Sequence, residues 1–262
     1  MTFENKRFAV TGSASGIGEA TVALLREKGA SVIGFDRMER ADNVDEFHPV
    51  ELTDFSSIEA AIGAVSGPVH GLCNIAGLPP REDNALLVLT VNFIALRYFT
   101  ETFVPKLNDG ASIVNMASLA GFGWLQNIEL VKAGLALKDD ADLETFCKEN
   151  NIGFPNSYHF SKQLVIAWTK LNVRKWADRG IRLNSISPGP VDTLILDDFL
   201  SAFGEKAKQG IESVGRAGRP DDIAPIVAFL LSEESGWISG TNIAAGAGGE
   251  ALMYDEILGL TK

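Results

Sequence analysis

The sequence contains few of the residues that build disulfide scaffolds or metal centres. Cysteine occurs only at Cys73 and Cys147, and histidine only at His48, His70 and His159, in a chain of 262 residues. These positions lie far apart in sequence, and none of them belongs to a cluster with zinc-ligand spacing. We therefore expect no disulfide framework, no metal site and a reducing compartment.

Positive charge and long apolar runs are also scarce. The chain has 23 Lys and Arg residues against 34 Asp and Glu residues, which gives a formal net charge of −11 at pH 7. A field of this sign repels nucleic acids and anionic membrane surfaces, so we expect neither as a partner. No uninterrupted apolar run reaches the roughly 18 residues of a membrane helix, and residues 1–7 do not resemble a signal peptide. We expect a soluble, cytoplasmic protein.

The remaining composition is that of an ordinary globular protein, with 46% hydrophobic and 22% charged residues. Its length fits one domain over residues 1–262. Short β-branched runs alternate with longer segments of helical periodicity, which predicts strand–helix–strand units. We expect an α/β fold, with a Rossmann-type doubly wound parallel sheet of about seven strands that binds ligands beyond its carboxyl strand ends. Strands are predicted near residues 8–11, 31–35, 47–50, 69–75, 111–117, 181–187 and 241–245, and helices near 17–28, 56–65, 84–107, 157–179 and 221–232.

A glycine-rich turn, Thr11 to Gly18, follows the first predicted strand and opens the first helix. Its glycines allow a tight turn and a close approach of the backbone to a ligand. The amides and the positive dipole end of the following helix favour a pyrophosphate. Because of this position, the turn is more specific than an isolated glycine-rich loop. We therefore expect this turn to bind the pyrophosphate of a dinucleotide cofactor through Gly12, Ser15, Gly16, Ile17 and Gly18.

Asp36 stands at the end of the second predicted strand, 18 residues after Gly18. A carboxylate there accepts both ribose hydroxyls of NAD and repels the 2′-phosphate of NADP. The neighbouring Arg37 is able to pair with such a phosphate, which keeps NADP as the alternative. An ordinary turn acid is the other interpretation of Asp36. We expect NAD.

Tyr158 and Lys162 are four residues apart, so a helix places both on one face. A phenol with a pKa of about 10 is a poor base at neutral pH, but a nearby ammonium lowers that pKa. Such a pair is a general acid/base for a carbonyl or alcohol oxygen. Alone it is weak evidence, because many amphipathic helices carry the same pair. His159 is turned about 100° away, and we expect it on the surface.

Taken together, these segments resemble the short-chain dehydrogenase/reductase family. The turn from Thr11 to Gly18 is similar to that family's TGxxxGxG pattern, and Tyr158 with Lys162 to its YxxxK pattern. Residues 74–77 resemble its NNAG segment, with isoleucine in place of the second asparagine, and residues 182–189 resemble the loop that closes over the nicotinamide. The resemblance covers nearly the whole chain.

The resemblance implies a role for each catalytic residue. Ser118 would hydrogen-bond the substrate oxygen, and Tyr158 would transfer the proton. Lys162 would bind the nicotinamide ribose and lower the pKa of Tyr158. Asn92 would hold a water that relays protons, unless its amide is satisfied inside its own helix. The further cofactor contacts that it implies are Glu51 and Leu52 at the adenine, where the family usually has Asp-Val, then Asn74, Ala76, Gly77, Pro188, Gly189, Val191 and Thr193.

Ser118 and Tyr158 are separated by 40 residues, more than is usual in the family. The extra segment, about residues 125–151, has two stretches of helical spacing with possible caps at Asp139 to Asp142, which predicts a two-helix hairpin. This resembles the bacterial 3α-hydroxysteroid dehydrogenase/carbonyl reductase subgroup. The resemblance implies that the hairpin obstructs the four-helix dimer contact usual in the family. A homo-oligomer would then use the helix after Pro220 and the last strand, or the chain forms no oligomer.

We therefore expect an NAD-dependent oxidoreductase that transfers a hydride between nicotinamide and a secondary alcohol or ketone. Leu119, Phe122, Trp124 and residues 194–203 are candidate pocket walls and favour a bulky apolar substrate, steroid-like or cyclic. Trp124 is alternatively a core residue, and the hairpin is either a pocket wall or a packing element. An NADP-dependent carbonyl reductase and a non-catalytic dinucleotide-sensing regulator are the alternatives. An acyl-carrier-linked enoyl reductase fits less well, because its Tyr–Lys spacing resembles YxxxxxxK.

Overall fold

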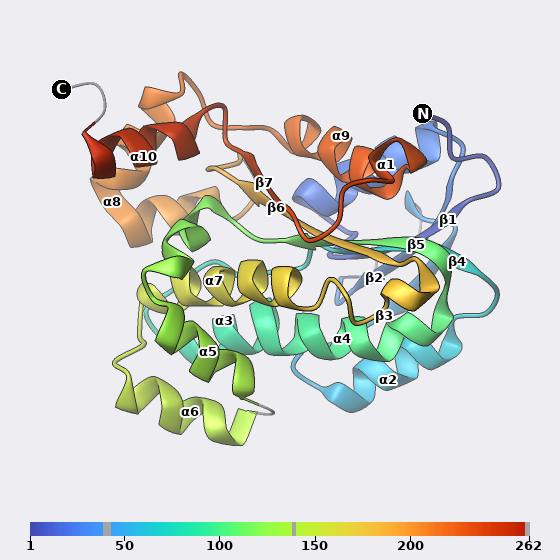
Figure 1. Ribbon diagram of the computed structural model, residues 1–262, viewed down its shortest axis with the longest axis horizontal. Coiled ribbons are helices and arrows are strands. Elements are labelled where there is room, and N and C mark those ends of the chain that lie inside the picture. Colours follow the sequence, from blue (N-terminus) through green and yellow to red (C-terminus); the bar gives the residue numbers. More distant parts are fainter. Residues whose placement is uncertain (39–42, 138–139, 260–262) are drawn as a thin grey trace.

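Seven parallel strands form one sheet in the order β3-β2-β1-β4-β5-β6-β7 (Figure 1). The computed structural model describes residues 1–38, 43–137 and 140–259. The strand order reverses between β1 and β4, and open α/β sheets bind their ligands at such a point. The predicted doubly wound sheet is confirmed. The strands are β1 (Arg7–Thr11), β2 (Ser31–Asp36), β3 (Glu46–Pro49), β4 (Val69–Asn74), β5 (Leu107–Met116), β6 (Arg182–Pro188) and β7 (Asn242–Ala245).

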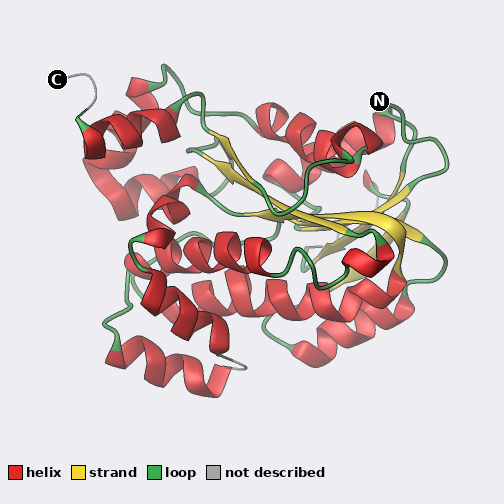
Figure 2. Ribbon diagram, in the orientation of Figure 1, coloured by secondary structure: helices red, strands yellow, loops and turns green. Residues whose placement is uncertain are grey.

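Helices cover both faces of the sheet (Figure 2). Helices α1 (Gly16–Glu27) and α9 (Pro220–Leu231) pack on one face, and α2 (Phe55–Ala64), α4 (Leu96–Phe103) and α7 (Asn156–Leu171) on the other. Side chains alternate between the faces of a strand. Val10 of β1 therefore lies in the apolar cluster under α1 and α9, and its neighbour Ala9 in the cluster under α2, α4 and α7. The core therefore has two apolar layers with the sheet between them.

The long predicted helix over residues 84–107 contains an irregular turn. It consists of α3 (Ala85–Leu89), a π-helical turn (Thr90–Ala95), α4 and a short 3-10 turn (Val104–Lys106). By length and composition alone, Ala85–Lys106 is apolar enough to cross a bilayer, although its apolar residues are interrupted by polar ones. However, 72% of its most apolar window is buried inside the protein, as in a core helix. A π-turn within such a helix often marks a functional position.

Other boundaries differ from the predicted ones for local reasons. The helix predicted over residues 157–179 ends at Leu171, where the side-chain amide of Asn172 donates to the carbonyl oxygen of Trp168 at 2.8 Å. As expected from the sequence, Asp54 caps α2 by accepting from the backbone amide of Ser56 at 2.9 Å. Cys73 and Cys147 are buried free thiols, and burial raises the pKa of both.

Among the described residues, three elements near the carboxyl edge of the sheet were not predicted, besides a short 3-10 turn (Glu233–Ser235). They are a 3-10 turn (Leu119–Leu125), α8 (Leu196–Ser213) and α10 (Gly249–Leu258). Most of the stretch 194–203, a candidate pocket wall, lies in α8. The hairpin is present as α5 (Ile128–Ala136) and α6 (Asp140–Glu149), whereas Asp139, one of its expected caps, lies outside the described residues.

Candidate active site

The glycine turn after β1 packs directly on the loop after β4. Gly12 and Gly16 have φ values of +70° and +56°, which glycine adopts without strain. A Cβ on Gly12 would lie 2.8 Å from the Cα of Ala76, so only glycine fits. The hydroxyl of Thr11 accepts from the backbone amides of Ile75 at 3.1 Å and Ala76 at 3.2 Å. The carboxyl ends of β1 and β4 are thereby tied together.

Helix α1 begins at this turn with its first amides uncapped by a side chain. Ser15 is the N-cap residue, and its hydroxyl makes no capping hydrogen bond. A Cβ on Gly18 would lie 1.9 Å from the carbonyl oxygen of Gly12, so glycine lets the helix approach the turn. The partly buried side chain of Ile17 packs on the apolar cluster beneath α1. The helix terminus has the donors that an anion requires.

Asp36 lies beside the same turn, at the end of β2. Its Oδ2 accepts from the amide of Ala14 at 3.0 Å, and its Oδ1 from the amide of Met38 at 3.0 Å. A carboxylate has about four acceptor positions, so two remain for hydroxyl donors. Arg37 is exposed. Both residues therefore lie where the sequence predicts them, with the carboxylate anchored to the turn.

Three other predicted cofactor residues have side chains that make contacts within the protein. Oε1 of Glu51 accepts from the amide of Thr53 at 3.0 Å, and Leu52 packs against the core. The side-chain amide of Asn74 is buried and donates to Thr100 Oγ1 and Asn115 Oδ1, both at 2.8 Å. The side chain of Asn74 is therefore directed into the protein and away from a ligand.

The loop after β6 crosses to the glycine turn. Pro188 ends β6 opposite Ala245, and the amide of Gly189 donates to Ala245 at 3.3 Å. Further along, Val191 forms a bridge with Gly218. A Cβ on Gly16 would lie 3.2 Å from the Cγ2 of Thr193. This loop and the turn thus enclose one region of the carboxyl edge of the sheet.

Ser118, Tyr158 and Lys162 converge at the end of β5. Ser118 caps the 3-10 turn, with its Oγ accepting from the amide of Ala120 at 3.2 Å, and it hydrogen-bonds the hydroxyl of Tyr158. Nζ of Lys162 lies 5.7 Å from the centre of the Tyr158 ring and donates to the carbonyl oxygen of Met116 at 2.8 Å. The spacing of four on α7 brings the two side chains together as predicted.

These three groups lie next to the glycine turn. A Cβ on Gly77 would lie 3.7 Å from Nζ of Lys162, and Gly77 directly follows Ala76, which packs on Gly12. A continuous set of contacts therefore joins the turn to the lysine. A hydroxyl, a phenol and an ammonium lie at one edge with a helix N-terminus, which suits proton transfer beside a bound dinucleotide.

Burial controls the pKa values of the pair. It raises the pKa of Tyr158 to about 12, and the hydrogen bond with Ser118 acts in the opposite direction. Burial also lowers the pKa of Lys162 to about 8. From the sequence we expected the ammonium to lower the pKa of the phenol. In the structure burial outweighs any lowering, because Tyr158 is only 8% exposed.

Asn92 lies in the π-turn, fully buried, and its amide is satisfied by the loop after β4. Its Oδ1 accepts from the amide of Leu78 at 2.7 Å, and its Nδ2 donates to the carbonyl oxygen of Leu78 at 3.1 Å and to Ser161 Oγ at 3.3 Å. The alternative of an amide satisfied within its own helix is therefore wrong. The side chain holds this loop against α7.

Helix α8 covers Tyr158 with aromatic rings, a contact that the sequence did not indicate. The Phe199 ring meets the Tyr158 ring edge to face, with centroids 4.9 Å apart, and Phe203 lies 6.4 Å away. Phe203 also contacts His159 at 4.7 Å, so His159 is half-buried and not on the surface as expected. The spacing of four between the phenylalanines is the signal that would have located this helix.

The other wall candidates separate into two groups. A Cβ on Gly246 would lie 2.6 Å from the Cδ1 of Leu119, which places Leu119 against the loop after β7. Phe122 meets Tyr254 of α10 edge to face at 4.7 Å. Trp124 packs against the large core cluster, in agreement with its core interpretation. Leu119 and Phe122 thus border the site, together with α8 and α10.

The hairpin packs on the face of α7 opposite the catalytic pair. A Cβ on Gly134 would lie 2.7 Å from Phe160 and 2.9 Å from Leu164. At 100° per residue, positions 160 and 164 lie on the side of the helix away from position 158. In the part of the hairpin that the structure describes, these contacts make it a packing element on the side of α7 away from Tyr158.

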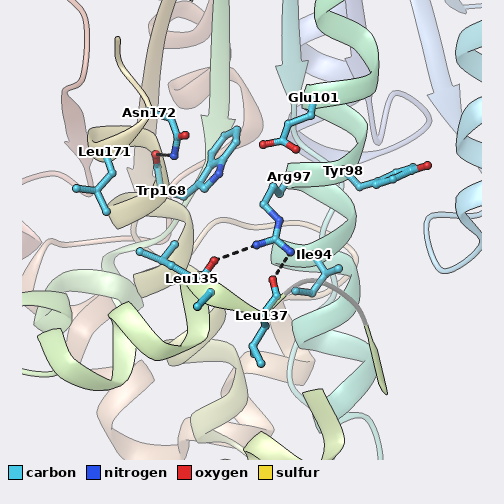
Figure 3. Close-up of a pocket in the computed structure, with 10 residues that line it drawn as sticks. Ile94, Arg97, Tyr98, Glu101, Leu135, Leu137, Trp168, Leu171 and Asn172 are labelled. Atoms are coloured by element: carbon cyan, nitrogen blue, oxygen red, sulfur yellow. Dashed lines mark hydrogen bonds between the residues drawn. The ribbon is translucent and has the colours of Figure 1, made fainter. Parts of the chain in front are cut away.

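A cavity of about 400 Å³ lies on this hairpin side, between α4, α7 and the end of α5 (Figure 3). Arg97 borders it and donates to the carbonyl oxygens of Leu135, at 3.2 Å, and Leu137. Figure 3 shows the guanidinium directed at the end of α5, with Trp168 beside it. None of the predicted site residues lines this cavity, so we place the active site at the sheet edge instead.

Comparison with known proteins identifies the class. Residues 6–129 match the family described as "short chain dehydrogenase", and residues 143–249 match the family described as "Enoyl-(Acyl carrier protein) reductase". The chain belongs to the short-chain dehydrogenase/reductase family and is an oxidoreductase of that class.

Similar proteins span almost the whole chain. Coniferyl-alcohol dehydrogenase of Pseudomonas sp. (strain HR199 / DSM 7063) is 36% identical over 256 residues, covering 97% of this chain and 100% of that protein. The 3-alpha-hydroxysteroid dehydrogenase/carbonyl reductase of Comamonas testosteroni is 26% identical, with coverage of 93% and 96%. The 3-alpha-hydroxysteroid dehydrogenase of Pseudomonas sp. B-0831, solved with NADH, has a TM-score of 0.83 and 30% identity, with coverage of 95% and 98%. The subgroup resemblance in the sequence is thereby confirmed.

Proposed function

We propose that this protein is an NAD-dependent dehydrogenase that interconverts a bulky, apolar secondary alcohol and its ketone. The observation that carries the proposal is the convergence of Ser118, Tyr158 and Lys162 beside the glycine turn. A protein that only senses a dinucleotide has no need for a buried phenol next to an ammonium. The convergence therefore favours turnover over sensing.

The residues at the sheet edge fit a dinucleotide. Gly12 and Gly16 leave space for a close backbone approach, and the start of α1 offers amide donors to a pyrophosphate. The carboxylate of Asp36 has acceptor positions left for ribose hydroxyls and repels a 2′-phosphate. NAD would supply or accept the hydride. The exposed Arg37 keeps NADP as the alternative, and the structurally similar hydroxysteroid dehydrogenase solved with NADH supports NAD.

The protein's own groups would handle the proton. With a pKa of about 12, Tyr158 holds its proton at neutral pH and is ready to donate it to a carbonyl oxygen. Ser118 would hydrogen-bond the same oxygen. Lys162 would bind the nicotinamide ribose, and its charge would stabilise the phenolate whenever Tyr158 gives up its proton. Asn92 would keep the loop after β4 in place beside the lysine, where a water is able to relay protons.

The surroundings of Tyr158 favour a substrate with a ring. Phe199 and Phe203 lie nearly parallel, at 17°, on the side of α8 that faces the phenol. Aromatic pairs of this kind bind rings through offset or edge contacts. The names of similar proteins, coniferyl-alcohol dehydrogenase and cyclohexanol dehydrogenase among them, also refer to ring-bearing alcohols. An alcohol carried on an aromatic frame is therefore the second candidate.

A substrate screen tests the proposal. Steroids, cyclic ketones, diketones and aromatic alcohols would be offered with NAD(H) and NADP(H), and turnover followed by NAD(P)H absorbance. We expect turnover of ring-bearing compounds with NAD(H) ahead of NADP(H). Preference for small acyclic substrates would contradict the substrate class, and preference for NADP(H) would contradict the cofactor.

We also propose a homo-oligomer that does not use the four-helix contact. The hairpin covers part of the α4 and α7 face, with Arg97 fastened to the end of α5. At the other end of the sheet β7 is an edge strand, and the fully exposed Trp237 lies shortly before it. An open strand edge beside an exposed tryptophan favours a second copy there. We place the enzyme in the cytoplasm as part of the same proposal.

A further inference from the structure

Helix α8 belongs to a segment that leaves the body of the protein and returns to the same point. The amide of Asp192 donates to the carbonyl oxygen of Gly218 at 2.8 Å, and the amide of Gly218 donates to that of Pro190 at 2.9 Å. These bonds pin the two ends of residues 192–217 side by side. We call these residues the α8 segment.

The α8 segment has few internal anchors. None of the described residues of α8 is fully buried, and the helix is interrupted at Gly204, where φ is 54° and ψ is −130°. Segments with little buried surface open at a lower free energy than the core. The closed position of this segment therefore depends on its contacts with the rest of the site.

One contact reaches across the site to the loop after β4. Nε of Arg81 donates to Oδ1 of Asp198 and its Nη2 donates to Oδ2, both at 2.9 Å. Two parallel bonds between a guanidinium and a carboxylate are charge-assisted and fix orientation as well as distance. The loop is itself braced, since Asn84 accepts from the amide of Arg81 at 2.7 Å and donates to Pro79 at 3.0 Å.

The ion pair adjoins the ring that covers the catalytic phenol. Asp198 immediately precedes Phe199, whose ring lies 4.9 Å from that of Tyr158. The Asp198 side chain is 24% exposed and that of Arg81 is 63% exposed, so the carboxylate is partly covered while the guanidinium faces water. The hydrogen bond from Arg81 also lowers the pKa of Asp198, which keeps the carboxylate charged.

We propose that Arg81 and Asp198 are positioning residues, whose ion pair latches the α8 segment across the site with Phe199 over Tyr158. Substrate entry and product release require the pair to part. The latch itself rests only on the contacts above, whereas its effect on turnover rests on the proposed function.

Limited proteolysis tests the latch on the protein alone. Lys206 and Lys208 are exposed on the α8 segment, so trypsin cleavage there reports its opening. In Arg81→Gln and in Asp198→Asn we expect cleavage at these lysines to become about two- to fivefold faster. Lys175→Gln, which breaks an exposed ion pair with Glu101 away from this segment, is the matched control and leaves the cleavage rate unchanged.

The reversed pair separates a latch from a merely structural role. Arg81→Asp combined with Asp198→Arg restores slow cleavage, while either change alone does not. In turnover assays, the single variants change KM and kcat in different proportions, and the reversed pair recovers the wild-type ratio. Wild-type cleavage rates in both neutral variants, or no recovery in the reversed pair, would overturn the latch. Faster cleavage in a protein that oxidises no alcohol would support the latch and refute the proposed function.

Discussion

The Nζ of Lys162 donates a 2.8 Å hydrogen bond to the carbonyl oxygen of Met116 and lies 5.7 Å from the ring centre of Tyr158. The last residue of β5 therefore holds the lysine, and the lysine in turn borders the phenol. Since both side chains are buried, the charge of each is sensitive to any change that admits water.

Tyr158→Phe tests the acid/base role. Removal of the phenol oxygen deletes the proton donor but leaves the glycine turn intact, so we expect turnover to fall about 10²- to 10⁴-fold with nearly unchanged NADH affinity. Steady-state kinetics and NADH titration measure the two effects. Retention of most of the turnover would show that another group transfers the proton.

Lys162→Met tests the buried ammonium through stability. The pKa of Lys162 is lowered from 10.5 to about 8 by folding, so between these values the unfolded chain binds more protons and stability rises with pH. This contribution is complete above 10.5 and is lost as the pH falls through about 8. We expect the free energy of unfolding of the wild type, relative to the variant, to rise by about 1 kcal/mol per pH unit in this window.

Urea unfolding at several pH values within this window measures the difference. The raised pKa of Tyr158 has the opposite sign, but it acts between its ordinary value of 10.0 and about 12. Tyr158→Phe is therefore the control that keeps the wild-type slope below pH 10. Parallel stability curves for the wild type and Lys162→Met would show that the ammonium is not desolvated.

Asp36→Asn tests cofactor choice. We expect NADH affinity to fall about tenfold, because charge-assisted bonds to the ribose become neutral ones. NADPH affinity should fall less or rise, since the repulsion of the 2′-phosphate is removed. Fluorescence titration with both cofactors gives the ratio, and Arg37→Ala is the matched control, expected to weaken NADPH more than NADH. An unchanged ratio in Asp36→Asn would remove Asp36 from cofactor selection.

Gly134→Ala tests the hairpin as a packing element. Its new Cβ would lie 2.7 Å from Phe160, so we expect a loss of about 1–3 kcal/mol in the free energy of unfolding with an unchanged substrate KM. The control is Gly63→Ala in α2, where nothing lies within 4 Å and alanine should stabilise the helix by about 0.5–1 kcal/mol. A changed KM at unchanged stability would instead place the hairpin at the substrate pocket.

Trp237→Glu tests the proposed assembly. A charge at this exposed position beside the edge strand should lower the molar mass measured by light scattering to that of a single chain. Leu171→Glu, at the exposed end of α7, is the control and should leave the mass unchanged, because the proposed contact does not use that face. A lower mass in Leu171→Glu and an unchanged mass in Trp237→Glu would instead place the contact on the α4 and α7 face.

The sequence predicted the sheet and the residue types of the site because these depend on local patterns. β-branched runs locate the strands, and the spacing of Tyr158 and Lys162 locates the catalytic face of α7. It did not predict that Asn74 would turn inward, since this follows from its register opposite Asn115 on the neighbouring strand. The π-turn at Asn92 likewise depends on a distant loop at Leu78.

Helix α8 was not predicted, although its phenylalanines have helical spacing, because it lacks the other features by which a helix is recognised. It has no capping hydrogen bond, no fully buried residue among those described, and a break at Gly204 that interrupts its periodicity. The burial that raises the pKa of Tyr158 was not predicted either, since rings that cover the phenol come from this helix.

The two sides of helix α7 have separate roles. One side presents Tyr158 and Lys162 to the reaction, and the reverse side, with Phe160 and Leu164, receives the hairpin. An engineer who wishes to broaden the range of alcohols accepted would therefore vary α8 and leave the hairpin alone. To raise the thermal stability of the enzyme, the hairpin would be varied and α8 left unchanged.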